Sequence, residues 1–326
     1  MADPVSSDVV SAVFEHLAES FRLDHVIGDR TLRDLLEETL RELDADETPT
    51  WGPTGGSTSD LVRVADGPLT FAYRPHLFPD MSADLRLGHE VQFHLLPRTL
   101  PMDAPVEIAA VLESYCHLSG DLFGWRQEPD GRFSVWVVDV SGHGVRAGFA
   151  AVVLKLLISR SEPGLPPDRL IRWIEDRFLE ARNPHDGRCL YATGLFLIVD
   201  ADGRMEYASA GHPPFLVRRT HGTVSTHEAT GPPIALIPGC PSNLRGLQLT
   251  ADDLVVMYTD GLVEAHGRDR DALGIDGLIE FLSARTGRPS ETASALLGHV
   301  GTSLDMDRLD DDVSFLVMSR RSSGVS

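Results

Sequence analysis

The amino-acid sequence predicts an α+β protein in which two sheets are covered by helices on the outside, preceded by a smaller, mostly helical region. Beyond Pro105, strand-like apolar runs follow one another along the chain, and only a few helical patterns interrupt them. This order argues against a doubly wound parallel sheet, in which strands and helices alternate. Asp202-Gly203 stands between two of the runs and is a typical hairpin turn. The predicted strands are 106–115, 133–140, 194–199, 205–208, 215–218, 246–249, 254–258 and 313–318, and the predicted helices are 145–160, 167–182, 275–285 and 290–304.

The first third of the chain has a different residue pattern, which is mostly helical. Apolar residues recur at helical spacing over 9–21 and again over 32–43. A segment rich in Pro, Gly, Ser and Thr follows near 48–60 and has the composition of a linker. A short strand-like piece and a further helical pattern lead to Pro97 and Pro101, which end that helix.

These boundaries predict four parts. They are a mostly helical N-terminal region over 1–82, a linker helix within 83–104, a main domain over 105–321, and a tail over 322–326. The simplest interpretation of the N-terminal region is a helical dimerisation segment, so we expect a homodimer.

The composition restricts the partners. The apolar fraction of 42% and the charged fraction of 24% are those of a globular protein. A formal net charge of −20 repels nucleic-acid phosphates and anionic lipid headgroups. We therefore expect neither nucleic acid nor a membrane as a partner, and we expect cations to suit the chain better.

The cysteines and the apolar runs indicate a compartment. Cys116, Cys189 and Cys240 are odd in number and widely spaced, which fits a reducing environment rather than a disulfide framework. The first eight residues lack the pattern of a secretory signal. The longest apolar run, 147–158, contains Lys155 and is shorter than the roughly 20 residues that cross a bilayer. We expect a cytoplasmic protein.

Acidic residues stand where strands end or turns open. Asp121 follows Ser119-Gly120, Asp139 ends an apolar strand, Asp260 ends another, and 310–312 are three aspartates before the last strand. Each one alone is more often a turn residue. Strands that deliver carboxylates to one shared end of a sheet build a cage of oxygen ligands, which a hard divalent cation would neutralise. Two such cations about 4 Å apart activate water and polarise a phosphoryl oxygen.

Two other motifs suggest different sites. Gly142-x-Gly144-x-x-Ala147 formally fits a dinucleotide fingerprint between a strand and a helix. However, Asp139 would place a carboxylate near the pyrophosphate, and no apolar strand follows the helix. Asp305-x-Asp307 begins like a calcium loop, but the later ligand positions lack oxygen donors.

Six motifs, taken together, resemble a known family. In order along the chain they are SGD (119–121), DVSGHGVRA (139–147), SAGHPP (209–214), TGPPIAL (230–236), YTDGLVEA (258–265) and DDDVS (310–314). They resemble the SpoIIE/RsbU branch of the PPM (type-2C) metal-dependent serine/threonine protein phosphatases, over roughly 90–320. Gln92 with Leu95-Leu96-Pro97 is similar to the linker that precedes this domain in the family.

The resemblance implies a fold and a site. The fold is an αββα sandwich of two mainly antiparallel sheets, with two Mn²⁺ or Mg²⁺ ions at one end. By position, Asp139 would bridge both ions, the backbone carbonyl of Val140 would join one, and Asp260 and Asp311 would complete the site. Asp121 would act on the second ion directly or through water. Asp139 and Asp121 are therefore the implied catalytic residues, and activated water would attack the phosphorus without a covalent intermediate.

The resemblance also implies a substrate and a mode of regulation. The substrate would be phosphoserine or phosphothreonine on a regulatory protein, such as a STAS-type anti-sigma-factor antagonist. An activator would act on the N-terminal region and reach the phosphatase through the linker helix. The alternative is a pseudophosphatase that serves as a binding or scaffold module. Ser119 and Gly124 replace family residues and keep that alternative open, whereas retention of the carboxylates argues against it.

Three further positions depart from the wider family or call for a role. Cys116 stands where eukaryotic relatives carry a phosphate-binding arginine, which leaves the phosphate clamp unidentified. Ser141 replaces a histidine, so we expect His143 to serve at the helix start or behind the ligands rather than as a general acid. We expect a structural role for His212.

Overall fold

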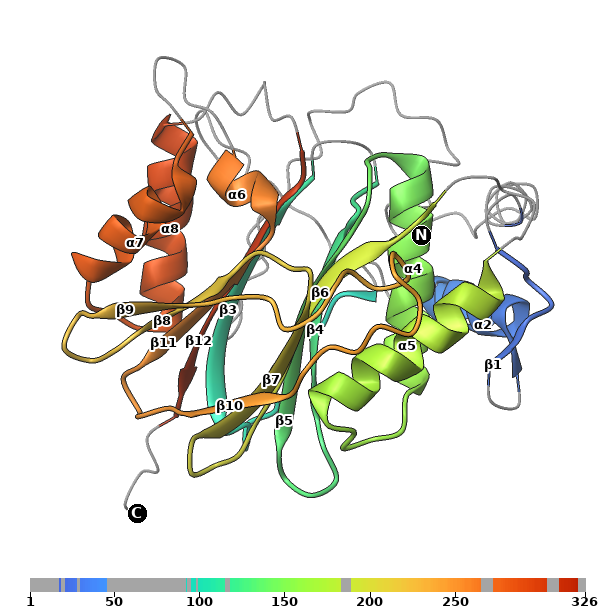
Figure 1. Ribbon diagram of the computed structural model, residues 1–326, viewed down its shortest axis with the longest axis horizontal. Helices are drawn as coiled ribbons and strands as arrows, with labels where there is room; N and C mark the ends of the chain where they lie inside the picture. The colour runs from blue at the N-terminus through green and yellow to red at the C-terminus, as the bar shows by residue number, and fades with distance from the viewer. Residues whose placement is uncertain are drawn as a thin grey trace.

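The computed structural model of the 326-residue chain describes residues 18, 21–27, 30–45, 92, 95–97, 99–114, 118–182, 189–264, 272–303 and 311–321. Its centre is a pair of five-stranded sheets packed face to face (Figure 1). One sheet has the strand order β10-β7-β6-β5-β4 and the other the order β3-β12-β11-β8-β9. Every neighbouring pair of strands is antiparallel.

Each sheet has its own set of strands. The first contains β4 (Asp121–Gln127), β5 (Phe133–Val140), β6 (Ala192–Val199), β7 (Arg204–Ala210) and β10 (Arg245–Gln248). The second contains β3 (Val106–Glu113), β8 (Phe215–Arg218), β9 (Val224–His227), β11 (Leu254–Tyr258) and β12 (Val313–Arg320).

Helices cover the outer face of each sheet (Figure 1). Over the first sheet lie α4 (Val145–Arg160) and α5 (Pro167–Ala181). Over the second lie α7 (Gly274–Ser283) and α8 (Pro289–Ser303), and the short α6 (Asp260–Glu264) follows β11. These four layers confirm the predicted αββα sandwich.

The alternation of side chains along a strand explains the long apolar runs. Successive residues point to opposite faces of a sheet. On β5, Val135 and Val137 face the core between the sheets, while Trp136 and Val138 face the helices. Both faces are buried, so the strand is apolar throughout. For the same reason α4, which packs on the sheet and on α5, is apolar around most of its surface.

Five elements were absent from the sequence prediction, and three of them, β4, β9 and α6, lie in the main domain. Gly124 interrupts the apolar pattern of β4, and its Cβ position lies 2.4 Å from the ring of Trp136, so only glycine fits there. β9 is a polar edge strand that pairs with β8 alone. α6 has five residues, which is too few for a recognisable helical period.

Part of the N-terminal region packs on the main domain. It comprises β1 (Val26–Ile27), β2 (Arg30–Thr31) and α2 (Leu32–Ala45). Its apolar side chains belong to the same core cluster as those of α4 and α5. The Phe21 and Phe178 ring centroids lie 5.7 Å apart, and Arg160 lies 2.8 Å from Glu38.

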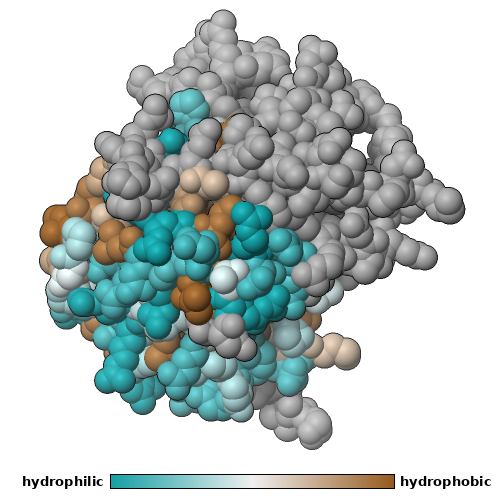
Figure 2. Space-filling model, turned by 90° about the vertical axis from the view of Figure 1, so that its right-hand side faces the viewer, coloured by the Kyte–Doolittle hydropathy of each residue, from teal (hydrophilic) through white to brown (hydrophobic). Residues whose placement is uncertain are grey.

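The outer surface of this side is mainly hydrophilic. Figure 2 views it from the side of α2 and α5, and most of the described surface is teal. This follows because α5 turns its apolar stripe, including Ile174 and Phe178, inward. Most of the predicted helix 9–21, the strand-like piece 61–73 and most of the helix 83–96 lie outside the described residues. No helix in the described ranges has both the length and the hydropathy to cross a membrane.

Candidate functional site

Two pairs of strand ends bring aspartates to one end of the sandwich. Asp121 begins β4 and lies directly opposite Asp139 near the end of β5. Asp260 follows β11, and Asp311 and Asp312 precede β12, the strand that pairs with β11. Because neighbouring strands are antiparallel, the start of one meets the end of the next. The predicted site residues therefore share one end of the two sheets, at the top of Figure 1.

Asp121 is the most enclosed of these carboxylates. It is 5% exposed, and its Oδ2 accepts a hydrogen bond of 2.7 Å from the hydroxyl of Thr259 on the opposite sheet. Its backbone N–H donates to Ser119 Oγ at 3.1 Å. Burial, followed by the charges of Asp139 and Asp312, raises the pKa of Asp121 well above its usual value.

The pKa values of Asp139 and Asp260 are also raised. Burial and then the charges of Asp260, Asp311 and Asp312 raise the pKa of Asp139 to about 7, although a hydrogen bond with Thr193 opposes the shift. Burial, Asp311 and then Glu264 raise the pKa of Asp260. Every charged group that contributes to these shifts is another carboxylate.

Asp311 and Asp312 have opposite environments although they are adjacent. Asp311 is exposed, and its Oδ1 accepts a hydrogen bond from the N–H of Asp312 at 2.8 Å. Asp312 is 3% exposed, and its Oδ2 accepts from the N–H of Gly120 at 2.7 Å. Asp312 thus ties the turn before Asp121 to the second sheet, a role that the sequence analysis missed.

Two glycines permit this close packing. A Cβ on Gly261 would lie 1.9 Å from the carbonyl oxygen of Asp312, so any side chain would separate α6 from β12. A Cβ on Gly120 would lie 3.1 Å from the carbonyl oxygen of Val140. The N–H of Val140 also donates to the carbonyl of Gly120 at 3.2 Å. The backbone of Val140 therefore lies beside the turn that leads into Asp121.

Thr259 and Gln92 position the site without carrying charge. The backbone N–H of Thr259 donates to Ser314 O at 2.9 Å, and its hydroxyl reaches Asp121. Gln92 Nε2 donates to the carbonyls of Ser119 at 2.7 Å and Gly148 at 2.9 Å, and its Oε1 accepts from the N–H of Ser119. Both residues stand within motifs of the sequence, but their positions alone predict no role for them. A threonine directly before a strand-terminal aspartate was the available signal.

The two histidines differ in burial. His143 is exposed at the start of α4. His212 is 2% exposed, and its Nδ1 lies 2.9 Å from the hydroxyl of Thr193, the residue opposite Asp139 on β6. Burial lowers the pKa of His212 to about 3, so the ring is neutral and packs as part of the core. This environment agrees with the structural role expected for it.

The donor set fits a hard divalent cation by chemistry. Carboxylate and carbonyl oxygens are the ligands that Mg²⁺ and Mn²⁺ prefer. A cation would also relieve the repulsion that raises these pKa values. Within the described ranges no three acidic, histidine or cysteine side chains converge as a preformed ligand set.

Comparison with known proteins places the chain in a family. The family model described as "Stage II sporulation protein E (SpoIIE)" matches residues 129–321. The phosphoserine phosphatase RsbP of Bacillus subtilis (strain 168) is 31% identical over 185 residues, which cover 56% of this chain and 45% of RsbP. The chain spans less than half the length of the curated relatives it matches.

Solved structures show the same fold. The PP2C domain of SiaA from Pseudomonas aeruginosa has a TM-score of 0.63 at 17% identity, covering 73% of this chain and 96% of that domain. The PP2C phosphatase domain of SpoIIE from Bacillus subtilis, solved with a fragment of its regulatory domain, has a TM-score of 0.58 at 21% identity. That match covers 67% of this chain and 63% of the solved chain. The fold is therefore that of the PP2C phosphatases, and the chain belongs to the SpoIIE family.

Proposed function

We propose that this protein is a metal-dependent phosphatase that removes phosphate from serine or threonine of a regulatory protein. One observation carries the proposal. Buried and half-buried aspartates from both sheets lie at one end of the sandwich, and the charged groups that raise their pKa values are all carboxylates. Protonation or a bound cation relieves such repulsion, and a divalent cation does so while the carboxylates stay ionised. Membership of the SpoIIE family supports the same activity.

The ligand roles are those that the resemblance to the PPM phosphatases implies. Asp139, the carbonyl of Val140, Asp260 and Asp311 would hold two Mn²⁺ or Mg²⁺ ions. Asp121 would serve the second ion directly or through water. The proximity of Asp260 and Asp311 to Asp139 supports this assignment, because their charges raise its pKa.

Neighbouring side chains hold Asp121 and the turn before it in place. Bound divalent cations would lower the pKa of a water molecule and polarise a phosphoryl oxygen. The hydroxyl of Thr259 donates to Oδ2 of Asp121 and so helps to fix the orientation of this carboxylate. Asp312 and Gln92 fix the turn that carries Asp121 from two sides. Asp139 and Asp121 are the catalytic residues in this proposal.

The proposal also names a class of substrate. We favour a STAS-type anti-sigma-factor antagonist carrying phosphoserine or phosphothreonine. The support is that RsbP, a relative at 31% identity, is named a phosphoserine phosphatase. A pseudophosphatase that binds the same partner is the second candidate. It is favoured by Ser119 and Gly124, which replace residues of the family pattern.

The N-terminal region would regulate the enzyme. Apolar residues within 21–27 and 32–36 pack on α4 and α5. Gln92 donates hydrogen bonds to the turn before Asp121 and to the first turn of α4. An activator acting on this region could therefore reach Asp121 through two helices. We place the enzyme in the cytoplasm, as a homodimer. Deleting residues 1–82 should change metal-dependent turnover or oligomeric state, and an unchanged result in both would exclude this role.

Hydrolysis of a small aryl phosphate tests the proposed activity. The full chain is assayed with and without Mn²⁺ beside an Asp139→Ala/Asp260→Ala double variant, and then with a phosphoserine protein. Activity that needs Mn²⁺ and disappears in the double variant supports the phosphatase. If the folded protein hydrolyses neither substrate with Mn²⁺, even after removal of residues 1–82, the scaffold role replaces it.

A further inference from the structure

A row of polar side chains continues beyond Asp139 across the first sheet. Thr193 on β6 lies directly opposite Asp139, as Asp121 does on the other side of it. Opposite residues of paired strands point to the same face of a sheet. Here that face lies between the two sheets, because Val137 and Leu195, each two positions away, belong to the core cluster between them. Thr193 forms a side-chain hydrogen bond with Asp139. The row therefore places a neutral donor beside the central carboxylate of the candidate site.

His212 is the next member of this row. Its Nδ1 lies 2.9 Å from the hydroxyl of Thr193, and the residue is 2% exposed. Burial lowers the pKa of the ring to about 3, although the nearby carbonyl of Tyr258 opposes the shift. A neutral imidazole carries a single N–H, either on Nδ1 or on Nε2. The nitrogen that carries this proton decides what the ring does for Thr193.

The hydrogen-bonding capacities of the three groups assign that proton. An ionised carboxylate only accepts hydrogen bonds, and a threonine hydroxyl has one proton to donate. When that proton goes to Asp139, the oxygen of Thr193 is left to accept from Nδ1–H of His212. Nε2 of His212 is buried and forms no hydrogen bond of ordinary geometry with any described residue, so it is the nitrogen that can stay unprotonated. The order of donation is therefore from His212 to Thr193 and from Thr193 to Asp139.

Two motifs of the sequence hold this arrangement in place. In SAGHPP, Gly211 has a φ of +62°, and a Cβ at this position would collide with the ring of Pro233. Glycine is thus required for the turn that delivers His212 to the row. In TGPPIAL, the N–H of Ile234 donates to the carbonyl of Ala192 at 2.7 Å, at the start of β6. The proposed metal ligands account for neither motif, whereas the row accounts for both.

We propose that Thr193 and His212 are positioning residues for Asp139, in which Nδ1–H of His212 donates to the hydroxyl of Thr193 and this hydroxyl donates to the carboxylate. The inference deepens the proposed function and rests on it, since it assigns the groups that orient one of the proposed metal ligands. Loss of a hydrogen-bond partner behind a metal ligand lowers metal affinity or activity by about 10- to 100-fold. The role is parallel to that of Thr259, which holds Asp121 from the opposite sheet.

Nitrogen NMR of His212 in the metal-free full chain tests the order of donation without any catalysis. The spectra are recorded on protein with isotope-labelled histidine at about pH 8, above the pKa of Asp139. The signals of His212 are assigned by their absence from His212→Asn. We expect a protonated Nδ1 and an unprotonated Nε2, and Thr193→Val should shift the Nδ1 resonance. A proton on Nε2, directed at the carbonyl of Tyr258, would overturn the proposal.

Mn²⁺ affinity, measured by calorimetry, tests the positioning role with two matched pairs of variants. Thr193→Val removes the hydroxyl and should weaken Mn²⁺ binding by about tenfold or more, whereas Thr193→Ser should retain most of the affinity. His212→Asn keeps a donor where Nδ1 lies and should also retain most of the affinity. His212→Gln places its amide where Nε2 lies and should weaken binding by about tenfold. His227→Gln changes a histidine–hydroxyl pair with Ser225 on the edge strand β9 and should leave binding unchanged.

Combining the variants separates positioning from packing. Because His212 acts through Thr193, adding His212→Gln to Thr193→Val should cause no further loss of Mn²⁺ affinity or turnover number. Additive losses would indicate a merely structural ring, and equal binding by His212→Asn and His212→Gln would likewise overturn the proposal. A wild type that neither binds Mn²⁺ nor hydrolyses the aryl phosphate would refute the proposed function instead. The spectrum of the metal-free protein would still test the order of donation by itself.

Discussion

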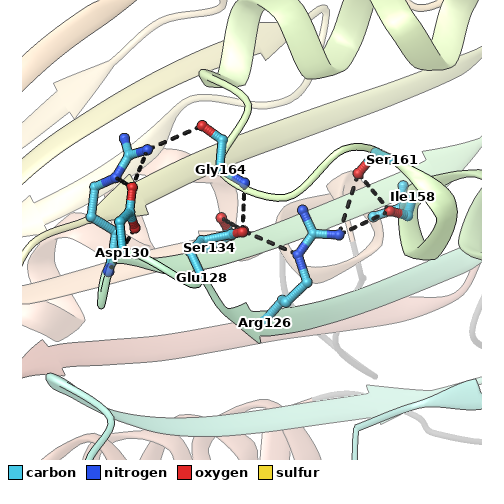
Figure 3. A network of polar contacts seen from close by, with 8 residues as sticks. Arg126, Glu128, Asp130, Ser134, Ile158, Ser161 and Gly164 are labelled. Atoms are coloured by element: carbon cyan, nitrogen blue, oxygen red, sulfur yellow. Dashed lines mark hydrogen bonds and ion pairs between the residues drawn. The ribbon is translucent and has the colours of Figure 1, made fainter.

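Buried carboxylates occur at both ends of the sandwich, but only one end compensates them. At the lower end, Glu128 accepts from Arg126 at 3.1 Å and from the N–H of Gly164 at 2.6 Å, and it also contacts Ser134 (Figure 3). Asp253 accepts from Arg219 and from the N–H of Thr250, each at 2.8 Å. At the upper end, Asp121 and Asp139 face other aspartates.

The pKa values express the same contrast. Burial alone would raise the pKa of Asp253, but the N–H of Thr250 and the side chain of Arg219 outweigh burial and lower it. Burial also acts on Asp139, and there the neighbouring charges reinforce it and the pKa rises to about 7. The comparison teaches that burial alone does not mark a site. The mark is a buried charge that the chain itself leaves uncompensated.

Replacing one carboxylate at each end should separate a role in metal-dependent hydrolysis from a role in stability. Asp139→Asn should lower metal-dependent hydrolysis by about 10³-fold, because metal ions contribute several kcal/mol to the transition state. Asp253→Asn should leave the turnover number of folded protein nearly unchanged. Steady-state kinetics on both variants, corrected for the folded fraction, makes the measurement. Equal losses in the two variants would break the comparison.

The stabilities should change in the opposite sense. Asp253→Ala should lower the free energy of unfolding by about 2 kcal/mol, because it removes the carboxylate of a pair with Arg219. This is below the loss for a fully buried pair, since Arg219 is 31% exposed. Asp121→Asn should not destabilise the metal-free protein, because it relieves repulsion. Urea unfolding in the presence of a chelator compares them, and a destabilised Asp121→Asn would contradict the account.

The stabilisation by Mn²⁺ should increase with pH. The folded pKa of Asp139 is raised to about 7 from an ordinary value of 3.8. Its contribution to metal-free stability is therefore complete below pH 3.8 and is lost as the pH rises through about 7. The rise in melting temperature caused by Mn²⁺ should be larger at about pH 8 than at about pH 5.5. Asp139→Asn should flatten this profile, whereas an equally steep profile would argue against Asp139.

The smallest effect is expected from the positioning hydroxyl. Thr259→Val removes the hydrogen bond to Asp121, which for a charged acceptor contributes about 1.5 kcal/mol and corresponds to about tenfold in the turnover number. Thr259→Ser keeps the hydroxyl and should retain most of the activity. If the two variants behave alike, Thr259 acts by packing and not through its hydrogen bond.

Much of the fold could be predicted from the sequence where burial is continuous. Helix α4 and strands β8 and β11 have the predicted bounds, because uninterrupted apolar segments define them. β4 was not predicted because Gly124 interrupts its apolar pattern. A glycine is needed there because the ring of Trp136, on the neighbouring strand β5, occupies the space of a side chain. Such a cause is tertiary and leaves no local signal.

The site was predictable in outline. Its candidate residues do gather at one end, and their ligand roles remain predictions. The sequence of three consecutive aspartates could not show which is buried, since the register of β12 decides that Asp312 points inward and Asp311 outward. The bonds of Thr259 and Gln92 also join distant segments, so only the folded chain reveals them.

Mn²⁺ binding is the most direct test of the central claim that the upper carboxylates form a metal centre. Calorimetric titration of the full chain with Mn²⁺ is compared with Asp139→Asn and with Asp253→Asn at the opposite end. We predict that the wild type and Asp253→Asn bind Mn²⁺ alike, and that Asp139→Asn binds on the order of 100-fold more weakly. Equal Mn²⁺ binding by all three proteins would contradict the account.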